Sequence, residues 1–239
     1  MAEKALEDRT VLVTGSSKGI GAATAKALAA QGAHVILTGR DVRALEAVED
    51  AIHEAGGAST IAPVDLTETD GIARLASAIA GRWDTLDGLV IAAAYLPTLT
   101  PVTQIDAKQF GQAITTNILA TQALLAAFDP LLKRADAARV IGLTSSVGES
   151  PRAYWSAYAS TKAAFDILLE SYAQEVEKVS KVRVAILDPG ATRTSMRAKA
   201  YPGEDPKTVK EPDVVADRIV ELMVNGFDSA HRERVSEPG

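Results

Sequence analysis

The sequence contains no cysteine among its 239 residues. This absence excludes disulfides, thiolate catalysis and cysteine-ligated metals, and no oxidising compartment is required. Histidine is also scarce. His34, His53 and His231 are scattered along the chain, and none has a carboxylate partner at the spacing of metal ligands. The sequence therefore predicts no metal site.

Long apolar runs and an excess of positive charge are missing as well. The longest uninterrupted apolar stretch is the eight residues from Leu89 to Leu96, whereas a membrane-spanning helix needs about 20. The first eight residues are charged and lack the apolar segment of a secretory signal. Lys and Arg number 25 against 31 Asp and Glu, a net charge of -6, which argues against nucleic acid or an anionic membrane as a partner. We expect a cytoplasmic protein.

What the sequence does contain is an ordinary globular mixture, with 47% apolar and 23% charged residues, and an alternation of two periodicities. Short apolar segments alternate with segments of helical spacing, which predicts parallel strands joined by right-handed crossovers in one doubly wound α/β sheet. We expect six or seven strands with helices on both faces. The expected strands are 10–14, 34–38, 59–64, 86–93, 139–145, 182–187 and, more weakly, part of 231–239; the expected helices are 19–31, 42–55, 67–82, 105–133, 158–178 and 212–224.

A glycine-rich turn joins the first expected strand to the first expected helix. It runs from Thr14 to Gly21 and has glycines at positions 15, 19 and 21. Glycines permit a tight turn and let backbone N–H groups approach a pyrophosphate at the positive end of the helix. The plainer alternative is a strand-to-helix turn whose glycines serve packing alone. The position between a strand and a helix favours dinucleotide binding.

With this TGxxxGxG turn, the chain resembles the short-chain dehydrogenase/reductase family over nearly its whole length. The resemblance implies one Rossmann-like domain over residues 1–239, a substrate-covering lid at 191–212, and a homo-oligomer, either a dimer or a tetramer. One departure is the stretch from Ile91 to Tyr95, where the family usually has Asn-Asn-Ala-Gly. The other residues that carry the resemblance follow in the family's order: Asp65, Asn117, Ser146, Tyr158, Lys162, Pro189 and Gly190.

The choice between the two nicotinamide cofactors rests on the end of the second expected strand. Asp41 lies 20 residues after Gly21, and a simple count would assign it to the ribose hydroxyls of NAD. The family's NAD-type acid, however, falls on the position held by Gly39. Arg40 follows it, and with Lys18 it is suited to a 2′-phosphate. We therefore expect NADP(H) rather than NAD(H), with Asp41 as a helix N-cap.

The expected catalytic group is a tyrosine and a lysine one helical turn apart. Tyr158 and Lys162 share a helix face, and a nearby ammonium favours a phenolate, so Tyr158 can exchange a proton with a carbonyl or alcohol oxygen. The family's spacing favours Ser146 as the group that orients the substrate, with Ser145 as the alternative. The resemblance also implies that Asn117 holds a water near Lys162.

The resulting interpretation is an NADP-dependent oxidoreductase that acts on a ketone or secondary alcohol. Two alternatives are the same reaction with NAD(H) and a catalytically silent dinucleotide-binding sensor. Trp155 and Tyr154 precede the expected catalytic tyrosine, and either line an apolar substrate pocket or simply pack. The expected cofactor-binding residues are Gly15, Ser17, Lys18, Gly19, Ile20, Gly21, Arg40, Asp65, Leu66, Ala92, Ala93, Tyr158, Lys162, Pro189, Gly190, Thr192 and Thr194.

Overall fold

A sheet of seven parallel strands runs through the centre of the protein, in the order β3-β2-β1-β4-β5-β6-β7. The structure is a computed structural model that describes residues 4–236. The reversal of strand order beside β1 is the switch point at which doubly wound sheets bind ligands. The strands are β1 (Thr10–Thr14), β2 (His34–Thr38), β3 (Ala58–Ile61), β4 (Gly88–Ile91), β5 (Arg139–Leu143), β6 (Arg183–Asp188) and β7 (His231–Arg234).

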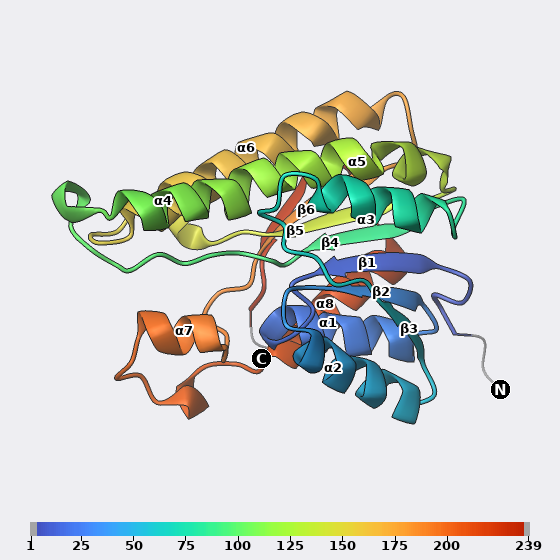
Figure 1. Cartoon of the computed structure of the whole chain (residues 1–239), viewed down its shortest axis with the longest axis horizontal. Helices are drawn as coiled ribbons and strands as arrows, with labels where there is room; N and C mark the ends of the chain where they lie inside the picture. Colours follow the sequence, from blue (N-terminus) through green and yellow to red (C-terminus); the bar gives the residue numbers. More distant parts are fainter. Residues whose placement is uncertain (1–3, 237–239) are drawn as a thin grey trace.

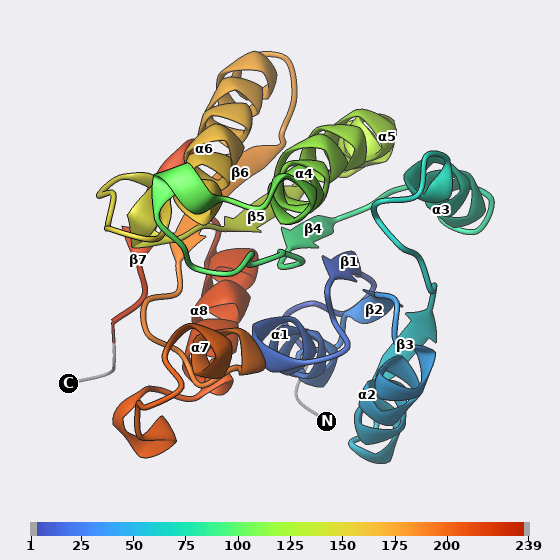
Figure 2. The same ribbon diagram turned by 60° about the vertical axis from the view of Figure 1, so that its left-hand side comes forward.

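Helices cover both faces of the sheet, as Figures 1 and 2 show. Helices α1, α2 and α8 pack with one apolar cluster, and α3, α5 and α6 pack with another. This arrangement confirms the predicted doubly wound α/β fold. The α-helices are α1 (Gly19–Ala30), α2 (Val42–Glu54), α3 (Gly71–Ala80), α4 (Ala107–Ile114), α5 (Ala120–Arg134), α6 (Ser156–Glu177), α7 (Ser195–Ala200) and α8 (Pro212–Asn225), with short 3-10 turns η1 (Val102–Gln104), η3 (Ser146–Gly148) and η4 (Pro206–Thr208) and a π-helical segment η2 (Thr115–Leu119).

The local sequence explains where these elements begin and where the predictions were imprecise. Asp41 caps α2 by accepting a hydrogen bond from the Ala44 N–H at 3.1 Å, as predicted. The helix predicted from residue 67 begins only at Gly71, because Thr67 instead donates its hydroxyl to Asp65 at 2.7 Å and forms a local turn. The expected strands 59–64, 86–93 and 139–145 are shorter in the structure. In the weakly predicted tail, a strand forms at His231–Arg234, and residues 237–239 lie outside the described part.

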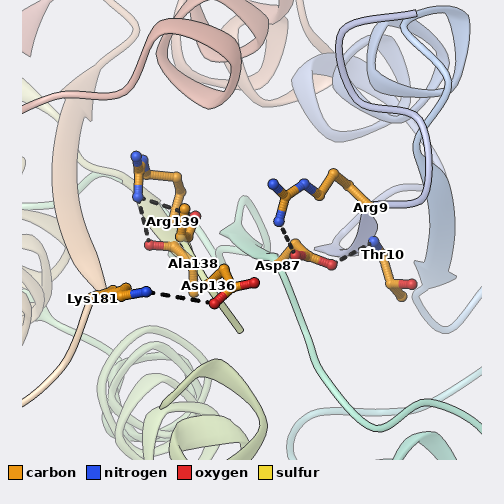
Figure 3. A network of polar contacts seen from close by, with 8 residues as sticks. Arg9, Thr10, Asp87, Asp136, Ala138, Arg139 and Lys181 are labelled. Carbon is orange, nitrogen blue, oxygen red and sulfur yellow. Dashed lines mark hydrogen bonds and ion pairs between the residues drawn. The ribbon is translucent and has the colours of Figure 1, made fainter. Parts of the chain in front are cut away.

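Charged side chains form contacts at the amino ends of the central strands. At the amino ends of the strands, Arg9 donates to Asp87 at 2.7 Å, and the second carboxylate oxygen of Asp87 accepts the Thr10 N–H at 3.0 Å. Figure 3 shows these contacts and, separate from them, the hydrogen bond that Arg139 donates to the Ala138 carbonyl at 3.2 Å. The Asp87 carboxylate joins the amino ends of β1 and β4.

Over residues 4–236, no helix is both long enough and apolar enough to cross a membrane.

Candidate active site

A cavity of about 240 Å³ lies at the carboxyl edge of the sheet, over the switch point between β1 and β4. The turns that follow β1, β2, β3, β4, β5 and β6 all contribute to its wall. Among the predicted cofactor-binding residues, Gly190 and Thr192 do not line it, and the Thr192 hydroxyl instead donates to the Pro189 carbonyl at 3.0 Å. The predicted residues that line the cavity are Gly15, Ser17, Lys18, Gly19, Ile20, Gly21, Arg40, Asp65, Leu66, Ala92, Ala93, Tyr158, Lys162, Pro189 and Thr194.

The glycines of the cofactor turn allow backbone segments to pack more closely than side chains would permit. Gly15 has φ +67°, and a Cβ there would lie 2.9 Å from the Ala93 Cα. A Cβ at Gly21 would lie 2.3 Å from the Gly15 carbonyl oxygen. Helix α1 follows at once, and its N-cap residue Lys18 makes no side-chain capping bond, so the first N–H groups of the helix face the cavity uncapped. This cradle fits a pyrophosphate group.

Two cations lie at the end of the cavity next to β2. Lys18 and Arg40 both line it and are both exposed. The Arg40 guanidinium lies 3.8 Å from the nearer carboxylate oxygen of Asp65. Burial alone would raise the pKa of Asp65, but hydrogen bonds from Thr67 and the charge of Arg40 outweigh it and hold the pKa below its usual value. Asp65 is therefore ionised, and it forms a loose, partly exposed ion pair with Arg40 at the cavity wall.

Tyr158 and Lys162 lie on the buried face of α6, at the opposite end of the same cavity. The Lys162 ammonium donates to the Leu143 carbonyl at 2.7 Å and lies 5.9 Å from the centre of the Tyr158 ring. Burial lowers the pKa of Lys162 to about 8, although the Asp166 carboxylate opposes this shift. Burial, helped by the charges of Asp188 and Asp166, raises the pKa of Tyr158 above its usual value. The expectation that the nearby ammonium would favour a phenolate is therefore wrong for this structure, because the cost of burying the charge outweighs it. At neutral pH the phenol is therefore protonated and the lysine cationic.

The two candidate serines lie after β5 and differ in their partners. Ser146 begins the 3-10 turn η3, and its hydroxyl lies 3.5 Å from the Arg152 guanidinium. Ser145 continues the extended backbone of β5, with φ -158° and ψ 143°. Within the described residues, its hydroxyl has no hydrogen-bond partner. Neither serine lines the cavity, whose wall at this point is formed by Leu143 and Thr144.

Asn117 has a bracing role that its sequence position did not suggest. It lies in the π-helical segment between α4 and α5 and does not line the cavity. Its side chain accepts the Tyr95 N–H at 2.8 Å, and donates to the Tyr95 carbonyl at 3.0 Å and to the Thr161 hydroxyl at 2.9 Å. These bonds tie the turn after β4 to α6. The relay through water stays a prediction.

The turn after β4 is also held where the family's asparagines are missing. The Thr14 hydroxyl accepts the N–H groups of Ala92 and Ala93 at 3.1 and 3.2 Å. It donates in turn to the Val90 carbonyl at 3.3 Å. Since Thr14 is the residue before the first glycine, one hydroxyl joins both turns that flank the switch point.

The predicted lid, residues 191–212, folds as α7 and η4 beside the cavity. Figure 1 shows this segment at the lower left of the view, outside the layers of helices that cover the sheet. Met196 lines the cavity, and its sulfur lies 4.0 Å from the Tyr158 hydroxyl. Lys199 donates to the Leu96 carbonyl at 2.9 Å, which connects α7 to the turn after β4. Thr194 caps α7 by accepting the Arg197 N–H at 3.1 Å.

A small apolar cluster surrounds the tyrosine beneath this lid. Tyr158 is buried there with Leu96 and Val147, and Trp155 and Met196 pack against them. Trp155 meets the Tyr158 ring edge-on, with centroids 6.1 Å apart. The neighbouring Tyr154 is instead exposed, with φ +72°. Trp155, and not Tyr154, therefore packs beside the tyrosine.

Several cavity residues were not predicted, because nothing local distinguishes them. They lie next to predicted residues or on elements brought close by the fold. Among residues 4–236, no group of three His, Asp or Glu side chains could hold a metal ion. The additional lining residues are Gly39, Val64, Thr67, Ala94, Tyr95, Gln112, Thr116, Leu143, Thr144, Ser195 and Met196.

A glycine cradle at the switch point of a doubly wound sheet, with a buried Tyr–Lys pair at the other end of one cavity, defines a dinucleotide-binding α/β protein. The family model for short chain dehydrogenases matches residues 9–205. The oxidoreductase YciK of Escherichia coli K12 is 36% identical over 230 residues, which cover 95% of this chain and 90% of the relative. The chain belongs to the short-chain dehydrogenase/reductase family, as the resemblance predicted.

Two solved structures extend this comparison to bound cofactors. A short chain dehydrogenase from Escherichia coli CFT073 complexed with NADPH has a TM-score of 0.93 at 34% identity and covers 100% of both chains. One from Shigella flexneri complexed with NADP has a TM-score of 0.93 at 33% identity, covering 99% of this chain and 100% of the other. The protein is thus an oxidoreductase by family, and these two solved relatives hold NADP or NADPH.

Proposed function

We propose that the protein transfers a hydride between NADP(H) and a small ketone or secondary alcohol. The observation that carries the proposal is that the glycine cradle, the Lys18–Arg40 end and the Tyr158–Lys162 pair share one cavity. The solved relatives with NADP and NADPH support the choice of cofactor. The two cations beside β2 support it independently, since they suit the extra phosphate of NADP(H).

Side chains of the protein supply the proton and orient the substrate. A bound nicotinamide dinucleotide supplies the hydride to the carbonyl carbon or accepts it from the alcohol. Tyr158 donates its phenolic proton to the carbonyl oxygen during reduction and removes a proton from the alcohol during oxidation. Its phenol is protonated near neutrality, so the proton is available for reduction. The Lys162 ammonium stabilises the phenolate that remains after the proton has left.

One of the two serines donates a hydrogen bond to the substrate oxygen. The sequence favours Ser146, whose hydroxyl lies within 3.5 Å of Arg152. The free hydroxyl and extended backbone of Ser145 support the alternative. We propose Ser145 as the donor, with Ser146 holding the following turn. Asn117 acts on this site through the turn after β4.

The substrate binds against the apolar cluster beneath the lid. Trp155, Leu96 and Met196 surround the tyrosine there, and the walls offer hydrocarbon and aromatic surface. Burial of apolar substrate surface stabilises the complex by about 25 cal/mol per Å². We therefore propose that the substrate is a carbonyl compound with at least one apolar substituent on the carbonyl carbon, rather than one in which both substituents are charged.

We also propose that the active form is a homo-oligomer in the cytoplasm. Leu119 in η2 and Ile167 in α6 expose 56% and 62% of their surfaces, on the helices that cover one side of the sheet. Large apolar side chains of this kind are commonly buried in subunit interfaces. Sedimentation of the purified protein would measure the oligomeric state, and a monomer at micromolar concentration would contradict this part of the proposal.

The activity is tested by a panel of ketones, aldehydes and secondary alcohols, with nicotinamide absorbance as the readout. NADPH titration by fluorescence is measured separately. We expect NADPH to bind and to be oxidised fastest with ketones that have an apolar substituent. Binding of NADPH without turnover on any carbonyl would favour a dinucleotide-binding sensor, and a failure to bind either cofactor would contradict the proposal altogether.

A further inference from the structure

Helix α6 has an ordered row of ionisable groups that continues beyond the catalytic pair. Tyr158, Lys162, Asp166 and Glu170 follow one another at intervals of four residues, so they lie on one face of the helix, one turn apart. Tyr158, Lys162 and Asp166 are 6%, 2% and 5% exposed. A buried carboxylate therefore stands next to the buried ammonium, on the side away from the tyrosine.

The partner of this carboxylate comes from the last strand of the sheet. Arg232 of β7 donates to an Asp166 oxygen at 2.7 Å and to Glu170 at 3.1 Å. Its Nε lies 2.6 Å from Glu149, which directly follows the η3 turn. The second oxygen of Asp166 is buried and has no partner within the described residues. One guanidinium thus connects α6, the serine turn and β7, and its charge is shared among the carboxylates of Asp166, Glu170 and Glu149.

We propose that Asp166 and Arg232 are positioning residues that together set the proton affinity of the catalytic Tyr158–Lys162 pair. The inference rests on the proposed function for its catalytic meaning, but the pairing itself is a property of the fold. Asp166 stabilises the Lys162 ammonium against the cost of burial. It also disfavours a phenolate at Tyr158. Arg232 limits both effects, because it offsets the same carboxylate from the other side.

Other charged groups face the catalytic pair and the Asp166–Arg232 ion pair from neighbouring elements. Asp188, at the end of β6, acts on Tyr158 and lies 3.7 Å from Arg234. Glu149 and Glu170 face Arg232 from η3 and α6. On the β5 side, Lys162 meets the Leu143 carbonyl, a neutral acceptor. Asp166 is thus the carboxylate that acts on both members of the pair.

The pairing predicts opposite effects for the removal of its two members. Asp166→Asn removes the negative charge, so protonated Lys162 and protonated Tyr158 are both less favoured. Arg232→Met leaves the Asp166 charge uncompensated, so both protonated forms are more favoured. Carbonyl reduction needs both groups protonated. Its alkaline limb therefore moves to lower pH in Asp166→Asn and to higher pH in Arg232→Met, each by about one pH unit.

A second ion pair on the same strand provides a matched control. Glu233 of β7 forms a two-point pair with Arg218 of α8, at 2.6 and 2.9 Å, on the other face of the sheet. Glu233→Gln and Arg218→Met remove comparable contacts from β7 without changing the charge beside α6. We expect these variants to lower the melting temperature and to leave the alkaline limb in place.

The experiment has two readouts on all four variants and on the double variant Asp166→Asn/Arg232→Met. The first is the pH profile of kcat/KM for carbonyl reduction at saturating NADPH. The second needs neither substrate nor cofactor: NMR titration of lysine side-chain carbons, with Lys162 assigned by comparison with Lys162→Met. We expect opposite shifts in the two single variants and a return toward the wild-type value in the double variant.

The outcomes separate this inference from the proposed function. Shifts of the same sign in Asp166→Asn and Arg232→Met, or no shift of the Lys162 titration, would overturn the inference even in an active enzyme. An alkaline limb that moves equally in the β7–α8 controls would also overturn it, because the effect would then be structural. An absence of NADPH-dependent turnover in the wild type would contradict the proposed function, while the NMR titration would still decide the pairing.

Discussion

The Lys162 ammonium donates a 2.7 Å hydrogen bond to the carbonyl of Leu143, the last residue of β5. The charge is buried between a helix and a strand end, next to the Phe165 ring at 4.2 Å. Burial removes its hydration shell, and although the Asp166 carboxylate opposes the shift, its pKa falls to about 8. Burial of this charge therefore lowers the stability of the fold while the lysine is protonated.

The first prediction concerns this loss of stability. Replacing Lys162 by Met removes the buried charge but leaves the Leu143 carbonyl without its partner, so we expect the free energy of unfolding to rise by about 1–2 kcal/mol at neutral pH. Turnover should be lost at the same time. Because the folded-state pKa of about 8 lies below the ordinary value of 10.5, the cost of burial is present below pH 8 and fades as pH rises toward 10.5. Urea denaturation at several pH values checks both the sign and this window.

The second prediction is the pH dependence of carbonyl reduction. Lys162 must remain cationic, so kcat/KM should be level near neutrality and fall about tenfold per pH unit above about pH 8. The substitution Lys162→Arg keeps the charge at all accessible pH values. If that variant retains measurable activity, its rate should not decline in this window. A wild-type profile that stays flat to pH 10 would show that the lysine proton is not required.

The third prediction concerns cofactor choice. Arg40→Ala removes the guanidinium that Asp65 holds beside the cavity, so the dissociation constant for NADPH should rise about ten- to a hundredfold. Lys18→Ala should act in the same direction. The affinity for NADH should change little in either variant. Fluorescence titration with both cofactors measures this, with Arg43→Ala as a control on the neighbouring helix. An equal loss of affinity for NADH would mean that Arg40 supports the turn rather than the phosphate.

The fourth prediction separates the two serines. If Ser145 donates to the substrate oxygen, Ser145→Ala should lower kcat about a hundredfold or more. Ser146→Ala should lose only its contact to Arg152 and retain most of the activity. The two variants differ by one position in the same turn, so each is the control for the other. The reverse ranking would support the choice that the sequence spacing favoured.

Much of the fold could be predicted because its signals are local. The apolar segment before Gly15 and the helix after Gly21 define the cofactor turn, and both lie where the sequence places them. Asp41 could be identified as an N-cap from its residue type and position. The family resemblance supplied Tyr158 and Lys162, which do line one cavity.

The contacts that were missed depend on residues far apart in the sequence. Asn117, which lies in a π-helical segment, hydrogen-bonds to Tyr95 and Thr161 and does not line the cavity. In the sequence, the β7 segment is a charged stretch near the end of the chain. No local sequence pattern therefore predicted that Arg232 would bind Asp166, which lies 66 residues earlier in the sequence. Charged residues in an edge strand have no apolar periodicity from which their partners could be derived.

The central claim is that Tyr158 exchanges the proton in an NADPH-dependent reaction, and Tyr158→Phe tests it most directly. The substitution removes only the hydroxyl, whose hydrogen-bond contact is the Met196 sulfur at 4.0 Å, so the fold and the cradle should be kept. We expect kcat for carbonyl reduction to fall about 10²–10⁴-fold while the dissociation constant for NADPH stays within about twofold of the wild-type value. Turnover at the wild-type rate in Tyr158→Phe would contradict the account.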